Sequence, residues 1–275
     1  MTSNTDRVVE HNRRMWERLA RAGIPYTRPS GRPPRSREGM RQFTDPRGRL
    51  RGVRLGAARV LALAAGGGWD AVVFAKLGAA VTLLDISTRQ LRTVRELARR
   101  EGARIRFVRG DMRDLSRFDD ASFDLVWHCH SLVFVREATR VIREVARVLA
   151  PGGTYVLSTM HPTTLRLYGT YRDGGWRPRT SYFDDAPVPH SSVEDATWDF
   201  GEKKVYAPTI EFGHTFETIL NGLSRAGLVV DGLWEFSPNP PDRQAEPGSD
   251  DHLETLFPAF IEVRARKPTA KMRKP

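Results

Sequence analysis

Residues 57–160 alternate short apolar runs with amphipathic, helix-like segments, and this alternation limits the possible folds more than any other feature of the sequence. Short β-branched runs separated by helical patterns are typical of βαβ units, in which a parallel sheet carries helices on both faces. The expected strands are 59–65, 79–84, 105–109, 123–127 and 154–159, and the expected helices between them are 69–77, 88–101 and 138–149.

Distinctive residues follow four of these strands. The glycines at 66–68 follow the first strand, Asp85 the second, Asp111 the third, and His128 and His130 the fourth. The carboxyl ends of parallel strands meet at one edge of the sheet, and ligands bind beyond that edge. We therefore expect these residues to form one ligand site.

The glycine loop and Asp85 together predict an adenosine-containing cofactor. Glycines allow a sharp turn and a close approach by a ligand, and the amides that open the next helix can face an electronegative group. Asp85 lies 17 residues beyond Gly68, where a carboxylate can accept hydrogen bonds from both ribose hydroxyls. The loop also matches the loose GxGxxG/A pattern of NAD enzymes, which alone is a weak signal. Asp111, placed to reach an adenine amino group, argues against NAD.

Residues 58–160 carry a family resemblance in VLALAAGGG, GAAVTLLDIS, VRGDMRDLSRFDDASFDLVWHCHSLVFV and REVARVLAPGGTYVLS. In order and spacing these segments resemble the class I, Rossmann-like S-adenosylmethionine-dependent methyltransferases. GHTFETILNGLSRAGLVVDGLWE and LFPAFIEVRARKP match more loosely, and HNRRMWERLARAGIPYTRP is similar to the cap of bacterial small-molecule members. The resemblance implies a doubly wound, mostly parallel seven-stranded α/β sheet with helices on both faces, an N-terminal helical cap and an insertion after strand 5. It also implies S-adenosyl-L-methionine as cofactor and S-adenosyl-L-homocysteine as product.

The resemblance also implies which residues hold the cofactor. The methionine part lies at the loop, the ribose on the second-strand acid and the adenine near the third strand. The family's loop has an acid and a first glycine where this chain has Ala62 and Ala64, and an alanine at 64 predicts an ordinary backbone angle. The implied residues are Ala64, Ala65, Gly66, Gly68, Asp85, Ile86, Asp111, Met112 and His128.

The chain outside residues 55–160 is less regular. A helix is expected near 6–21, and the Pro-, Gly- and Arg-rich stretch 23–37 predicts irregular structure. The expected segments are a basic arm with a cap helix at 1–54, a cofactor-binding core at 55–160, a substrate cover at 161–212, a helix and strand hairpin completing the core at 213–268, and a tail at 269–275.

Four histidines are candidates for catalysis. Methyl transfer is an in-line displacement that needs alignment, exclusion of water and, for a protonated nucleophile, a base such as neutral histidine. His128 and His130 are expected to share one face of the fourth strand, with Cys129 on the other, which argues against a metal site. Both could instead line the cofactor. His161 could simply end the fifth strand, and His214 could orient a helix start at Thr215.

Aromatic residues concentrate in the expected cover, since residues 161–212 hold nine of the 25 in the chain. Aromatic walls suit a planar or apolar substrate and can favour a sulfonium by cation–π contact. A small apolar core or a dimer contact would explain them equally, and Trp16 could serve helix packing. The candidate substrate-binding residues are Trp16, Tyr26, Tyr168, Tyr182 and Trp198.

Charge and composition limit the classes of partner and cellular location that we expect for this protein. Of a net charge of +11, residues 1–54 contribute +9 through 14 arginines and five acidic residues, so we expect a solvated basic arm and no general nucleic-acid surface. No run approaches the ~20 apolar residues of a membrane span, and no secretory h-region is visible. The lone Cys129 excludes a disulfide framework and is compatible with a cytoplasmic protein.

Together these observations predict a methyltransferase that modifies O, N or C of a small molecule, such as a specialised metabolite. Two alternatives stay open beside an NAD dehydrogenase. One is an RNA methyltransferase that uses the basic arm. The other is a protein that binds the cofactor for a non-methylating reaction. The sequence leaves the oligomeric state open, including a homodimer.

Overall fold

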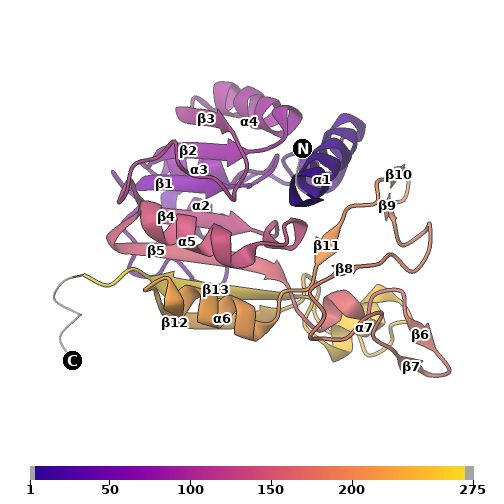
Figure 1. Ribbon diagram of the computed structural model, residues 1–275. Helices are drawn as coiled ribbons and strands as arrows, with labels where there is room; N and C mark the ends of the chain where they lie inside the picture. The colour runs from indigo at the N-terminus through magenta and orange to yellow at the C-terminus, as the bar shows by residue number, and fades with distance from the viewer. Residues whose placement is uncertain (1–3, 270–275) are drawn as a thin grey trace.

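A seven-stranded sheet organises the chain, whose computed structural model describes residues 4–269 (Figure 1). The strand order is β12-β13-β5-β4-β1-β2-β3, with β1 to β5 parallel and β13 antiparallel to both β5 and β12. This is the doubly wound arrangement expected from the sequence. The strands are β1 (Arg59–Leu63), β2 (Ala80–Asp85), β3 (Ile105–Arg109), β4 (Phe123–Cys129), β5 (Leu149–Met160), β12 (Val229–Phe236) and β13 (Phe260–Arg266).

Helices cover both faces of the sheet. One face carries α2 (Arg37–Thr44), α3 (Asp70–Lys76) and α4 (Thr88–Glu101), and the other carries α5 (Ala138–Val148) and α6 (Phe216–Arg225). The cap helix α1 (Asn4–Ala22) packs beside α4. It lies at the same end of the sheet as the insertion, on the right in Figure 1.

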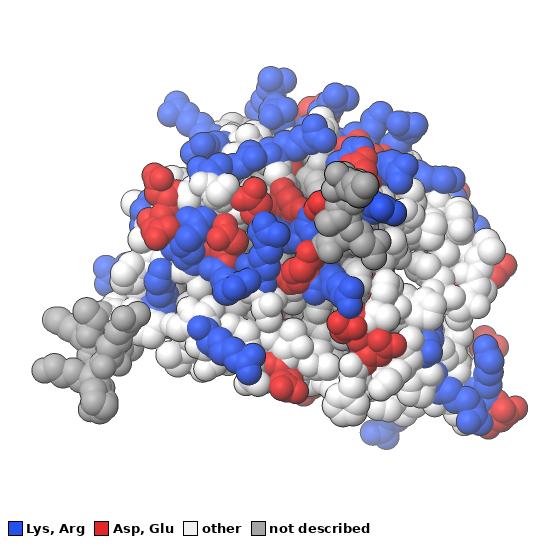
Figure 2. All heavy atoms as spheres, in the orientation of Figure 1, with Lys and Arg blue, Asp and Glu red and all other residues white. Residues whose placement is uncertain are grey.

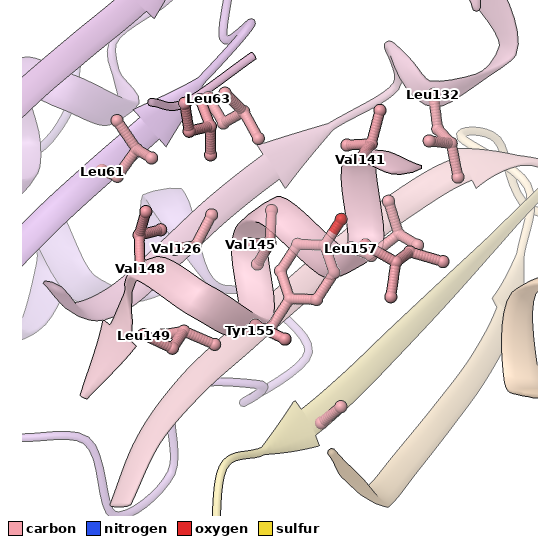
Figure 3. Packing of buried hydrophobic residues seen from close by; sticks show 14 of the residues in the cluster. Leu61, Leu63, Val126, Leu132, Val141, Val145, Val148, Leu149, Tyr155 and Leu157 are labelled. Carbon is pink, nitrogen blue, oxygen red and sulfur yellow. The ribbon is translucent and has the colours of Figure 1, made fainter. Parts of the chain in front are cut away.

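The central strands are apolar on both faces, as expected for a parallel sheet between two helical layers. Figure 3 shows Leu61 and Val126 packed with Val145 of α5. On the opposite face Ala62 and Leu125 pack with residues of α3 and α4. These two buried layers hold the carboxyl ends of β1, β2 and β4 in fixed positions relative to one another.

Several elements differ from the expectations. The stretch 23–37 is irregular except for the 3₁₀ turn η1 (Pro25–Thr27), but the helix α2 follows it directly, with Ser36 accepting a hydrogen bond from Gly39 N as N-cap. β5 begins at Leu149, five residues before the expected start, because Leu149 already pairs with Phe123; residues 150–153 then interrupt the register, and pairing resumes at Thr154. The helix α7 (Asp250–Leu256) is also new; it begins at Ser249, a second polar N-cap. The tail residues 270–275 lie outside the described residues.

The insertion contains only short elements joined by loops. Two hairpins and one longer-range pair of strands replace the regular pattern, because no run in this segment offers a continuous apolar face. They are η3 (Thr164–Arg166), β6 (Tyr171–Arg172) with β7 (Gly175–Trp176), β8 (Pro187–Val188) with β11 (Glu211–Phe212), and β9 (Thr197–Asp199) with β10 (Lys204–Tyr206). Within residues 4–269 no helix is both long and apolar enough to cross a membrane.

Candidate active site

The loop after β1 makes the sharp turn that its glycines predict. Gly66 has a φ of 58°, in the left-handed region, and its amide donates to Asp85 Oδ2 at 3.2 Å. Ala64 also has a left-handed φ, of 46°, so the expectation of an ordinary backbone angle there was wrong. Its amide donates to Leu84 O at 2.7 Å, and this bond to β2 holds the turn despite the strain of a Cβ.

A segment of the cap covers the glycine loop. The backbone of η1 lies directly on it, and a Cβ at Gly67 would overlap the carbonyl oxygen of Thr27. The same Cβ would also lie 2.8 Å from Oε1 of Gln90, which is buried in α4. A Cβ at Gly68, in contrast, would meet nothing within 4 Å. Gly67 therefore serves packing, whereas Gly68 leaves open space at the start of α3.

The two glycines predict opposite responses to alanine. Gly67→Ala is expected to push η1 off the loop and to destabilise the fold by about 1–3 kcal/mol, as overpacking does, lowering the Tm by roughly 5 °C. Gly68→Ala is the matched control and should leave the Tm within about 1 °C. Thermal unfolding of both variants measures this difference, and equal Tm values would show that η1 does not pack as described.

Asp85 is buried at the end of β2, with 6% of its surface exposed. Its Oδ1 accepts from Ser87 N at 2.8 Å and its Oδ2 accepts from Gly66 N. Burial raises the pKa of Asp85 to about 6, although these backbone hydrogen bonds act to lower it. Glu17 of α1 lies nearby, where it accepts from Ser87 Oγ at 3.0 Å and adds to the rise.

The third strand supplies a paired acid. Asp111 accepts from the Arg113 backbone amide at 2.9 Å and from the Arg113 guanidinium at 2.7 Å. Arg113 also binds Glu137 at 2.9 Å, so the Asp111 carboxylate is held in place by an ion-pair network. Met112 is half-buried against the core beneath it, and Ile86 is half-buried beyond Asp85.

The structure separates His128 from His130, and the expectation of a shared face was wrong. His128 is fully buried, with Nδ1 2.8 Å from the Tyr155 hydroxyl on the α5 side. His130 lies beyond the end of β4 with a left-handed φ of 56°, which turns its ring toward Ser158 and Phe260. Burial lowers the pKa of His128 to about 3 and that of His130 to about 4, so both rings are neutral at pH 7.

The other two histidines already have partners. His161 Nε2 donates to Glu235 Oε1 of β12 at 3.1 Å, and its Nδ1 accepts from Thr163 N. His214 Nε2 donates to the carbonyl oxygens of Leu132 and Val135, and burial lowers its pKa. Among residues 4–269 no group of three or more His, Cys, Asp or Glu side chains is placed to hold a metal ion.

The five aromatic candidates do not converge on one wall. Trp16 and Tyr26 both pack edge-on against Trp198, with ring centroids 5.5 and 6.1 Å apart. Tyr168 lies beside α7, where its hydroxyl donates to Glu254 at 2.9 Å. Tyr182 accepts from the amide that begins α6. The first three therefore join the cap to the insertion, while the last two lie in separate contacts.

Known proteins resemble this chain in sequence and in fold. A family model described as a methyltransferase domain matches residues 61–157. The methyltransferase YbaJ of Bacillus subtilis (strain 168) is 36% identical over 180 residues, which are 64% of this chain and 68% of YbaJ. An S-adenosylmethionine-dependent methyltransferase from Mesorhizobium loti superposes with a TM-score of 0.64 at 26% identity, over 84% of this chain and 100% of that one. The chain belongs to the class I S-adenosylmethionine-dependent methyltransferases.

A more distant relative of this methyltransferase has a named pathway. The ubiquinone biosynthesis O-methyltransferase of Xanthomonas euvesicatoria pv. vesicatoria (strain 85-10) is 33% identical over 111 residues. The match covers 40% of this chain and 46% of that protein, so this chain spans less than half the length of that relative. The family assignment makes the chain an S-adenosylmethionine-dependent enzyme and removes the NAD dehydrogenase alternative.

The residues of the methyltransferase fit a nucleoside cofactor at the carboxyl edge of the sheet. Asp85 offers a buried carboxylate whose two backbone hydrogen bonds leave acceptor positions free. At Gly68, in the loop that bonds to Asp85 through Gly66, a Cβ would meet nothing within 4 Å. His128 Nε2 is buried at the end of β4 and finds no hydrogen-bond partner among the described residues. Such unsatisfied buried atoms are costly and point to a ligand.

The pKa of Asp85 gives the cofactor affinity a pH dependence. If Asp85 holds the ribose, as we propose below, the ribose hydroxyls donate to the ionised carboxylate, so that bound cofactor lowers the pKa of Asp85 from about 6. The affinity would then be near its full value at pH 7 and above, and would fall as the pH decreases through 6. We expect the Kd for S-adenosylhomocysteine to rise about tenfold between pH 7 and pH 5. Calorimetry at constant ionic strength tests this, and a constant Kd would place the ribose elsewhere.

Sequence reasoning missed several residues around this site. Gln90 and Glu17 are polar residues on the inner faces of α4 and α1, a pattern that a periodicity plot could have revealed. Asn12 is buried and donates to Phe134 O and Ile210 O, which ties α1 to the insertion. Ser131 carries a buried hydroxyl without a partner among the described residues, and no local signal marks it.

Proposed function

We propose that this methyltransferase transfers a methyl group to O, N or C of a small-molecule acceptor held beneath α1 and the insertion. The observation that supports the proposal is the set of contacts that join α1 to the insertion and to the segment after β4. Trp16 lies 5.1 Å from Phe134, which follows β4, and 5.5 Å from Trp198 of the insertion. Asn12 adds hydrogen bonds to both segments. A cover built from side-chain contacts excludes water and suits a small, apolar acceptor.

The cofactor assignment forms part of the proposal. S-adenosylmethionine supplies a methyl group already activated on a sulfonium. We assign the ribose to Asp85, the adenine to Ile86 and Met112, and the methionine part to the loop that ends at Gly68. Asp111 then acts near the adenine while paired with Arg113. Ala64, Ala65 and Gly66 shape the loop and contribute backbone groups.

His128 is the histidine that fits a role at the acceptor. Its ring is neutral at pH 7 and its buried Nε2 is unpaired among the described residues, whereas His161 and His214 are bound to other groups. We assign to His128 a hydrogen bond that orients the acceptor, with the Tyr155 hydroxyl holding the ring. The name of the Xanthomonas relative supports an oxygen acceptor.

The experiment that tests the function uses S-adenosylmethionine labelled in the methyl group. Phenols, catechols, secondary amines and activated ring carbons form the acceptor panel, and total RNA forms a separate arm. We expect label in a small acceptor together with equimolar S-adenosylhomocysteine. Label recovered in RNA alone would reject the small-molecule proposal and favour an RNA methyltransferase.

A further inference from the structure

An open groove of about 660 Å³ lies between α1 and the start of α4. Its lining contains two residues other than arginine, Glu17 and Thr88, and none of the residues assigned to the cofactor. Thr88 is three residues beyond Asp85, so the groove is next to the cofactor site but separate from it. The arginines that line it are Arg13, Arg14, Arg18 and Arg21 of α1 and Arg109 at the end of β3.

The positive charges of the groove are largely unbalanced. Arg13 pairs with Glu10 at 2.6 Å, and Glu17 is occupied by Ser87 Oγ and the amide of Arg89. The remaining four arginines form no ion pair with any residue in the range 4–269, and all four are exposed. Four guanidinium groups thus line one opening in which Glu17 is the single acidic side chain, and Glu10 interacts at longer range with Arg14 and Arg109, so the positive charge is in excess.

The groove continues into a wider basic face. Residues 87–109 contain eight arginines and two glutamates, and α4 packs beside α1. Figure 2 shows the resulting band of blue side chains along the upper edge of the molecule, where Figure 1 places α4 and α1. The basicity is therefore not confined to the N-terminal arm, as the sequence suggested. A concave surface lined by one sign of charge concentrates ligands of the opposite sign.

The lining specifies the chemistry of the ligand. Guanidinium groups bind phosphate oxygens in bidentate pairs, and four unpaired groups match more than one phosphate. No aromatic side chain lines the groove, so a base or ring would find no stacking partner there. S-adenosylmethionine carries no phosphate and cannot be this ligand.

We propose that the groove binds a ligand through two or more phosphate groups, supplied either by a free polyphosphate or by the backbone of an RNA. This inference goes beyond the proposed methyl transfer and does not depend on the acceptor. Arg14, Arg18 and Arg21 face the ligand from one side of α1, and Arg109 faces it from the sheet. Glu17 accepts from Ser87 Oγ and Arg89 N at the start of α4, so its carboxylate is already paired there and only partly offsets the four arginines.

The test compares two variants of equal charge change. In R14Q/R18Q/R21Q the groove loses three arginines, and in R172Q/R225Q/R243Q three exposed arginines elsewhere are lost. Calorimetry with inorganic pyrophosphate and anisotropy with a labelled 20-nucleotide RNA, both in 0.1 M salt, measure binding. We expect the groove variant to weaken binding of at least one probe more than tenfold and the control variant to change it less than twofold.

The two arms distinguish the sources of phosphate. Saturable pyrophosphate binding without tighter RNA binding identifies a free polyphosphate. Tighter RNA binding, with a slope of log K against log salt near −3, identifies a phosphodiester backbone contacting about four phosphates. Absence of binding by both probes, or equal binding by the wild type and the groove variant, overturns the proposal.

Binding of S-adenosylhomocysteine serves as the folding control and separates this proposal from the proposed function. It should be unchanged in the groove variant. If the triple variant no longer binds S-adenosylhomocysteine, the single variant Arg18→Gln is used in its place. Its binding of the phosphate probes is expected to be about threefold weaker than that of the wild type.

Discussion

Replacing Asp85 with alanine is expected to weaken S-adenosylhomocysteine binding at least a hundredfold. The ribose would lose two hydrogen bonds to an ionised acceptor, each contributing about 1.5–3 kcal/mol in a buried site. A total near 3 kcal/mol corresponds to a factor of about 100 in Kd. Calorimetry at pH 7.5, where the carboxylate with its pKa of about 6 is ionised, measures the full effect.

Two further variants make this result specific. Asp85→Ala also leaves the amides of Gly66 and Ser87 without an acceptor, so part of its effect could come from a distorted loop. Asp85→Asn keeps the volume and one acceptor oxygen and should still weaken binding at least tenfold. Asp119→Ala, an exposed acid outside the site, should bind as the wild type does. A folded Asp85→Ala protein with unchanged Kd would reject the ribose assignment.

Arg166→Met is expected to destabilise the protein by about 3 kcal/mol or more and to lower its Tm by roughly 10 °C. Arg166 is 2% exposed and forms no salt bridge with any of the described residues, although the charge of Asp184 acts on it from nearby. Its guanidinium instead donates to four carbonyl oxygens, which belong to Pro162, Ser181, Asp184 and Gly213. It therefore joins the end of β5, the middle of the insertion and the start of α6. Methionine fills a similar volume but removes the donor from four carbonyl oxygens, of which those of Pro162 and Gly213 are in buried hydrogen bonds.

Thermal unfolding and limited proteolysis of the insertion measure this effect. Arg166→Lys keeps a charge and three donors but not the planar geometry, so its Tm should lie between those of the wild type and Arg166→Met. Arg136→Ala is the matched control, because Arg136 also contacts the insertion through Asp185 but the pair is exposed and contributes little. A Tm for Arg166→Met within 2 °C of the wild type would show that the insertion does not depend on this side chain.

The strand ends that the sequence placed at one edge of the sheet were predicted from local patterns. Apolar runs followed by glycine or aspartate mark strand ends, and the topology of a parallel sheet brings such ends to one edge. The hydrogen bond between Gly66 and Asp85 is the direct result. The backbone of Ala64 was missed because its left-handed angle is maintained by a bond to β2, a neighbour distant in sequence.

The sequence did not predict which side chains contact one another, for a related reason. His128 and His130 obey strand alternation only while the strand continues, and the chain turns at His130. Tyr168 and Trp198 belong to one aromatic-rich segment, yet Tyr168 bonds to Glu254 of α7, whereas Trp198 packs against Trp16 of α1. Composition gives the number of such residues but does not predict which helix or strand each of them contacts.

The sequence by itself determined the fold class, the family resemblance and the positions of the glycine loop and Asp85. Periodicity and turn residues encode these features within a few dozen neighbouring residues. Only the tertiary structure decided that Arg166 holds the insertion and that α1 lies beside α4 to form an arginine-lined groove. Arg166 is one of 38 arginines, and nothing near it in the sequence distinguishes it. Burial and charge balance arise from contacts between distant segments, and they exist only once the chain has folded.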